Sequence, residues 1–169
     1  MDGEQWRKET LRKMRSSRAA TLRLFDRINA RMMIKPETQG KWSVKDVFGH
    51  MVAWEKETCK RLDLILAGQS ERVYYYDDAS VMHRFNARAV SKYKTLSMNQ
   101  LLREAAEIRA QLVDRLKMLP AAEINNPSHR YPVSEWLEEF ACTHEQDHRE
   151  RIQKVLSART RATRQKGRA

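Results

Sequence analysis

The chain has 169 residues, with 33 Lys and Arg against 22 Asp and Glu, which gives a formal net charge of +11. This length corresponds to one domain, and a hydrophobic content of 41% excludes a chain that is disordered throughout. No run approaches the ~18 apolar residues of a membrane span, and the first residues lack the apolar stretch of a signal peptide. Two cysteines exclude a secreted disulfide scaffold. We therefore expect a soluble, cytoplasmic protein with reduced thiols.

The composition favours helices. Only five Gly and four Pro interrupt the chain, and the segments between them are rich in Leu, Ala, Arg, Lys, Glu and Met, which are good helix formers. No alternating apolar and polar run has the length of a convincing strand. The sequence therefore predicts an all-α fold.

The first predicted helix covers residues 5–33, where apolar side chains recur at helical spacing with Arg and Lys on the other face. The segment IKPETQGKW then ends it. The second helix begins sharply, because Ser43 and Asp46 have the spacing of a capping box, and Gly68 is a plausible end. Its apolar stripe contains Val44, Val47, Phe48, Met51, Trp54, Leu62, Ile65 and Leu66.

Residues 69–77 form a predicted loop that includes the consecutive tyrosines 74–76. The tyrosines could line the mouth of a pocket or pack on one end of the molecule, and we favour packing. Two further helices are expected over residues 78–94 and 98–119, either as separate helices or as one broken helix. After a turn-rich stretch, Ser134 is expected to cap the last helix.

These long amphipathic helices with moderate connections predict an antiparallel four-helix bundle over residues 1–156. Residues 157–169 lack apolar periodicity and are expected to be a disordered basic tail. Residues 1–35 carry ten basic and four acidic side chains, and residues 149–169 carry eight and one. Such basic segments could contact nucleic acid or anionic lipid. We favour a solubilising tail, because it has no aromatic side chain on which a base could stack.

Three histidines form a candidate metal site. His144 and His148 are four residues apart, so both rings project from one face of the last helix, which continues an apolar stripe. His50 lies at the edge of the apolar stripe of the second helix. Three inward imidazoles suit a divalent Zn, Ni, Fe or Cu ion with a position left for water or substrate. The alternative is three interior histidines without a metal. The other two, His83 and His129, lack this pattern and are predicted at the surface or in loops.

Residues 144–148 also match HExxH, in which Glu145 would act as the general base of a metalloprotease. A protease is disfavoured because residue 154 is Lys, no acidic residue follows Glu150, and no strand could hold a peptide. Glu145 lies about 100° around the helix from His144 and is expected to face solvent rather than a metal-bound water. Cys59 and Cys142 face away from the histidines by the same helical geometry and are predicted to be packing residues.

The motif from Trp42-Ser43 through Asp46 to His50, followed by the late His144-x-x-x-His148, resembles the DinB/YfiT-like superfamily, and the first part also resembles its ClbS/DfsB-like branch. The resemblance covers most of residues 1–156. It implies a four-helix bundle and a metal held by His50, His144 and His148. Members include thiol-dependent transferases and isomerases, candidate metal-dependent hydrolases and proteins induced by damage or stress.

Three functions follow from these observations. The first is a metal-dependent enzyme, either a hydrolase or a thiol transferase with a low-molecular-weight thiol as cofactor, acting on a small-molecule substrate through the histidines. The second is a non-catalytic helical stress-response protein. The third is a nucleic-acid-associated protein that uses the basic first helix and tail. We favour the first. A homodimer is plausible, because long bundle helices often leave an apolar edge exposed, and no membrane association is expected.

Overall fold

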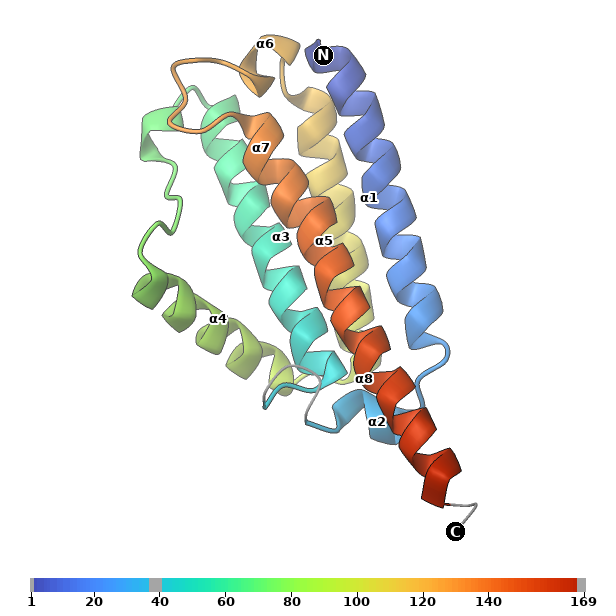
Figure 1. Ribbon diagram of the computed structural model, residues 1–169. Helices are drawn as coiled ribbons and strands as arrows, with labels where there is room; N and C mark the ends of the chain where they lie inside the picture. Colours follow the sequence, from blue (N-terminus) through green and yellow to red (C-terminus); the bar gives the residue numbers. More distant parts are fainter. Residues whose placement is uncertain (1, 37–40, 167–169) are drawn as a thin grey trace.

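The computed structural model describes residues 2–36 and 41–166 (Figure 1). The backbone over these residues forms helices and no β-strand, as the composition predicts. The long helices are α1 (Gly3–Phe25), α3 (Val44–Leu66), α4 (Ala79–Lys94), α5 (Met98–Met118) and α8 (His144–Lys166). The shorter elements are α2 (Ala30–Ile34), η1 (Ser70–Arg72), α6 (Ala121–Ile124), α7 (Val133–Glu138) and the π-helical turn η2 (Glu139–Thr143).

Helices α1, α3, α5 and the continuous α7–η2–α8 segment lie side by side and enclose the core (Figure 1). Helices α3 and α5 run in the same direction, because α4 carries the chain back along the outside of α3. The neighbours of the bundle are therefore both parallel and antiparallel, as in bundles with long crossover connections. None of the described helices is long and apolar enough to cross a lipid bilayer.

The core consists of the apolar faces that the helical periodicity predicts. On α5 the side chains of Leu101, Leu112 and Leu116 have no exposed surface. Helix α4 reaches α3 closely at Gly49, where an added Cβ would lie 2.6 Å from the Cβ of Tyr93. A larger residue at this position would push α4 away from the helix that carries His50.

The structure corrects several predicted elements. The helix expected over residues 5–33 is two helices, because α1 ends at Phe25 and Asn29 caps α2 by accepting a hydrogen bond from the Met32 N–H at 2.9 Å. Part of the turn-rich stretch before the last helix is the short helix α6.

Ser134 does not cap the last helix, which begins one residue earlier at Val133. Pro132 occupies the cap position, and the Ser134 hydroxyl donates to Asn125 Oδ1 at 2.5 Å instead. The tail was expected from residue 157, but the described backbone is helical through Lys166 and extends beyond the bundle (Figure 1). Residues 167–169 of the tail lie outside the described residues.

Candidate metal centre

The three histidines are positioned by helix ends. The capping box predicted at Ser43 and Asp46 is present: the Asp46 N–H donates to Ser43 Oγ at 3.1 Å, and the Ser43 N–H donates to Asp46 Oδ2 at 2.9 Å. This cap fixes the start of α3, and His50 follows in its second turn. On the facing helix the π-helical turn η2 ends at Thr143, directly before His144. Single π-helical turns occur frequently at functional sites.

The structure brings His50, His144 and His148 together. The Nε2 atoms of His50 and His144 are 3.0 Å apart, and those of His148 and His144 are 2.9 Å apart. One ligand atom from each ring lies within 4.8 Å of the other two. Each side chain of His50 and His148 is only 4% exposed, and that of His144 is partly buried. The spacing argument therefore identified three side chains that meet in space.

Hydrogen bonding alone accounts poorly for this arrangement. A neutral imidazole has one N–H donor and one acceptor lone pair. His144 Nε2 contacts two other Nε2 atoms, but in either tautomer it has only one N–H or one lone pair to share between them. The Nδ1 atoms of all three rings are buried without a hydrogen-bond partner among the described residues. A cation bound by all three Nε2 atoms would give each of their lone pairs a partner.

The electrostatics of the site favour neutral rings. Burial lowers the pKa of His50 to about 2 and that of His148 to about 3, and in both cases the His144 ring lowers it further. Burial also lowers the pKa of His144 to about 4, against the opposing effect of Asp147 and Glu145. Neutral imidazole is the form that binds metal ions. The two short Nε2–Nε2 distances, 2.9 and 3.0 Å, also lie in the range of about 2.9–3.3 Å expected for neighbouring nitrogen ligands of one ion with metal–nitrogen bonds of about 2.0–2.1 Å.

Aromatic side chains pack around the three histidines. The Trp42 ring lies 5.0 Å from the His50 ring, and the Phe140 ring lies 6.3 Å from the His144 ring. Trp54 stacks on Phe140 with centroids 4.7 Å apart and an interplanar angle of 7°. The Trp54 indole N–H donates to Asn86 Oδ1 on α4 at 3.0 Å. Ring packing therefore orients the imidazoles, in place of hydrogen bonds to their Nδ1 atoms.

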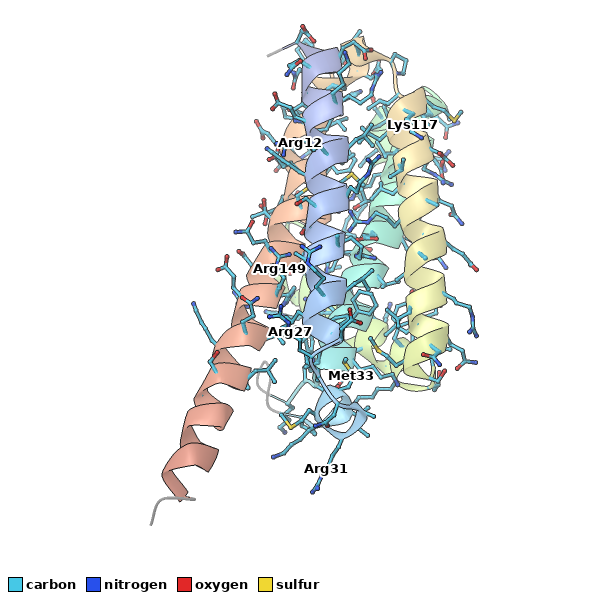
Figure 2. All side chains as sticks on the ribbon, turned by 90° about the vertical axis from the view of Figure 1, so that its right-hand side faces the viewer. Arg12, Arg27, Arg31, Met33, Lys117 and Arg149 are labelled. Carbon is cyan, nitrogen blue, oxygen red and sulfur yellow. The ribbon has the colours of Figure 1, made fainter. Side chains whose placement is uncertain are left out.

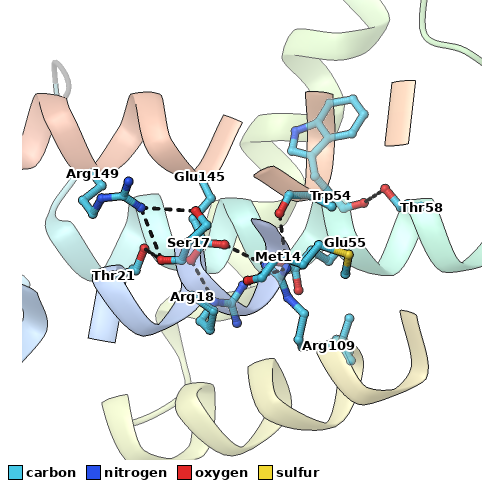
Figure 3. A network of polar contacts seen from close by, with 12 residues as sticks. Met14, Ser17, Arg18, Thr21, Trp54, Glu55, Thr58, Arg109, Glu145 and Arg149 are labelled. Carbon is cyan, nitrogen blue, oxygen red and sulfur yellow. Dashed lines mark hydrogen bonds and ion pairs between the residues drawn. The ribbon is translucent and has the colours of Figure 1, made fainter. Parts of the chain in front are cut away.

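Glu145 does not face solvent, so that expectation is wrong. Its side chain is buried in the bundle, where Oε1 accepts from Arg18 Nε at 2.8 Å and Oε2 accepts from Arg109 Nη2 at 2.7 Å (Figure 3). Burial raises the pKa of Glu145, but the two arginines outweigh it and lower the pKa below its ordinary value. Both oxygens are thus engaged away from the histidines, and the general-base role of Glu145 remains a prediction that this geometry does not support.

The remaining candidates are mostly where the sequence places them. Cys59 and Cys142 are buried, and burial raises the pKa of their thiols to about 11 and about 12. His83 is exposed on α4. His129 lies in the loop before α7 as expected, but its ring is buried, with Nε2 2.9 Å from Glu123 Oε2.

Sequence reasoning missed one charged residue close to this site. Arg61 on α3 is 2% exposed, although a Lys or Arg in an amphipathic helix is expected at the surface. Arg61 lies eleven residues after His50, which is close to three full turns, so both side chains are on the same side of the helix. This spacing is the one feature of the sequence that indicates that Arg61 lies near the site. The tyrosine segment pairs with it: Tyr76 packs on Trp54 at 5.3 Å and also lies over the Arg61 guanidinium.

Comparisons with known proteins support the family and the fold. The family model described as the DinB superfamily matches residues 13–152. No curated protein sequence matches the chain. Similar solved structures include the colibactin self-resistance protein ClbS in complex with a double-stranded DNA, with a TM-score of 0.76, 13% identity, and coverage of 89% of this chain and 94% of that chain.

Two further structures have the same fold. An uncharacterised protein from Escherichia coli UTI89 has a TM-score of 0.76 and 12% identity over 91% of this chain and 94% of that chain. A protein from Streptococcus pneumoniae has a TM-score of 0.74 and 14% identity over 93% and 91%. At these identities the structures support the fold alone. The family model covers most of the sequence, and the chain therefore belongs to the DinB superfamily.

Proposed function

We propose that this protein is a metal-dependent enzyme that acts on a small molecule through His50, His144 and His148, as a hydrolase or a thiol-dependent transferase. The observation that supports this proposal is the convergence of three neutral imidazoles, two buried and one partly buried, with Nε2 atoms 2.9 and 3.0 Å apart. A divalent ion held there would supply Lewis acidity: it can lower the pKa of water to about 7 and polarise a substrate oxygen or hold a thiolate.

The protein's own residues would bind the ion and exclude water. Trp42, Trp54 and Phe140 pack around the imidazoles and would give a bound substrate an apolar environment. Neither cysteine is a candidate nucleophile, because both thiols are buried and their pKa values are raised. A transferase would therefore need a thiol from a low-molecular-weight cofactor.

The metal content of the untagged protein tests the proposal directly. We expect about one equivalent of Zn, Ni or Fe per chain by elemental mass spectrometry, since three neutral imidazoles form a metal site with open positions. His144→Ala removes the ring that contacts both others and should lose the ion. His83→Ala, at an exposed histidine, should retain it. Absence of metal after reconstitution of the wild-type protein with these ions would sink the proposal.

A second candidate is a non-catalytic stress-response or binding protein that associates with nucleic acid. It is favoured by the exposed Arg12 on α1, the exposed Arg27 in the turn after α1 and Arg149 on α8, which lie along one side of the molecule (Figure 2). The similar protein ClbS is described in complex with double-stranded DNA. A cytoplasmic location and a homodimer remain predictions in either case.

A further inference from the structure

Arg61 carries a buried positive charge without a counterion. Its side chain is 2% exposed, and it makes no hydrogen bond or ion pair with any residue that the structure describes. Nε and Nη2 are both fully buried without a partner. Buried charges in proteins are normally paired, because an unpaired one loses its hydration without compensation. The described part of the fold therefore provides no partner that accounts for the burial of this charge.

Aromatic rings surround the guanidinium. Its carbon lies 5.1–5.8 Å from the ring centroids of Tyr75, Tyr76, Trp136 and Phe140. Cation–π contacts of this kind stabilise a desolvated guanidinium. They compensate part of the lost hydration but provide no acceptor for the N–H groups, so the directional hydrogen-bonding capacity of Arg61 remains unused.

The nearby carboxylates are engaged elsewhere. Glu57 Oε2 lies 3.0 Å from Lys60 Nζ, and Asp77 Oδ2 lies 2.7 Å from Arg130 Nη2. Burial accordingly lowers the pKa of Arg61, although Glu57, Tyr75, Tyr76 and Asp77 act in the opposite direction. Within the described residues, the acids closest to Arg61 thus have other cations as partners.

Arg61 adjoins the histidine cluster through one shared ring. Phe140 lies 5.1 Å from the guanidinium carbon and 6.3 Å from the His144 ring, so the guanidinium is at most the sum of these two distances from that imidazole. Helix α3 carries His50, Trp54 and Arg61 on one side, and the facing helix carries His144 and Phe140. One small molecule could contact both groups.

The segment that covers Arg61 has a strained backbone. Tyr76 has φ 56°, a left-handed conformation that is unfavourable for a residue with a side chain. Tyr75 packs against Tyr131 at 4.9 Å, which joins this segment to the loop before α7. Strained residues of this kind occur frequently at ligand-binding positions.

We infer that Arg61 anchors the carboxylate of an aromatic or apolar substrate whose other end reaches the histidine cluster. A carboxylate matches the fork of one guanidinium. A phosphate dianion would need further cations, which the aromatic surroundings do not provide. The assignment of this carboxylate to a substrate rests on the proposed function, but the anion site itself does not.

Binding of phenylacetate to the metal-free protein tests the inference, with phenylacetamide as the neutral ligand of the same shape. Isothermal titration calorimetry should show at least about tenfold weaker binding for phenylacetamide than for phenylacetate, because only the carboxylate is an anion. Arg61→Gln should weaken phenylacetate binding at least about tenfold. Arg72→Gln removes one exposed positive charge at the same end of the molecule and should leave the affinity unchanged within about twofold.

A second measurement does not depend on a folded Arg61 variant. In the wild-type protein, the NMR signal of the Arg61 Nε–H should shift with phenylacetate and not with phenylacetamide. Equal binding of the two ligands, equal binding by wild type and Arg61→Gln, or no binding to the wild type would overturn the inference. Metal content is measured separately on the purified wild type and Arg61→Gln before the metal is removed, so loss of the metal site and loss of the carboxylate site are distinguishable.

Discussion

Burial keeps the imidazoles of His50, His144 and His148 uncharged, and it therefore makes the stability of the fold depend on pH. Their pKa values in the folded protein are about 2, 4 and 3, against an ordinary value of 6.5. Below pH 6.5 the unfolded chain therefore binds protons that the folded protein does not. Folding stability is complete above this pH and declines as the pH falls toward 4.

We expect the free energy of unfolding of the metal-free protein to be flat between pH 7 and 8 and to fall below pH 6.5. The free energy of unfolding falls by about 1.4 kcal/mol per pH unit for each histidine. For all three, the slope is therefore at most about 4 kcal/mol per pH unit. Urea unfolding at pH 7.5, 6 and 5 measures it. His148→Gln should reduce the slope by about a third. A free energy of unfolding that stays constant down to pH 5 would mean that the rings are solvated or already charged.

Single residues differ in how far the sequence reveals their role. The pairing of His144 with His148 was predictable because a spacing of four fixes two side chains on one helix face. The burial of Glu145 was not, because its partners Arg18 and Arg109 come from two other helices. Arg61 was missed for the same reason, since a charged side chain is expected in water unless the tertiary structure is known.

A buried network of charged side chains connects the helices α1, α3, α5 and α8 (Figure 3). Arg109 on α5 donates to Glu55 on α3 and, at 2.7 Å, to Glu145 on α8. Its Nη1 also donates to the Ala141 carbonyl within the π-helical turn η2 at 3.2 Å. Arg18 on α1 contacts the same two glutamates. This network fixes the register of the helices that carry the histidines.

We expect Arg109→Ala to destabilise the protein by about 3–5 kcal/mol, because it leaves Glu55 and Glu145 buried with one arginine between them. The matched variant on the same helix is Arg115→Ala, which breaks a partly exposed ion pair with Asp63 and should cost at most about 1 kcal/mol. Urea unfolding at pH 7.5 compares the two. Losses of similar size would show that the network contributes no more than a surface ion pair.

Most element boundaries were predictable where a cap exists. Ser43 and Ser97 start α3 and α5 through capping boxes that the sequence displays. The break between α1 and α2 was missed because the apolar spacing continues across it, while Asn29 caps the second helix locally. The π-helical turn η2 was not predicted, because no residue pattern in the sequence marks it.

The charge of the whole molecule is unevenly distributed, as its sequence indicates. The exposed arginines of α1 give one side a basic surface, and residues 157–169 add five basic and no acidic side chains. The bundle was also predictable as a whole, but its topology was not: only the contacts of α4 with α3 reveal that α4 is a crossover. Hydrophobic periodicity gives the faces of helices and not their order in space.

The nucleic-acid candidate predicts salt-dependent retention on double-stranded DNA. Each phosphate contact that is lost should reduce the slope of log K against log salt by about 0.9. Deletion of residues 157–169 should therefore lower both the affinity and the slope, and Arg12→Gln with Arg27→Gln should do so further. Lys117→Gln on α5 is the control, because this lysine has Asp114 as a neighbour at 3.8 Å. Retention that is unchanged by the deletion and by the two arginine variants would exclude this surface as a nucleic-acid site.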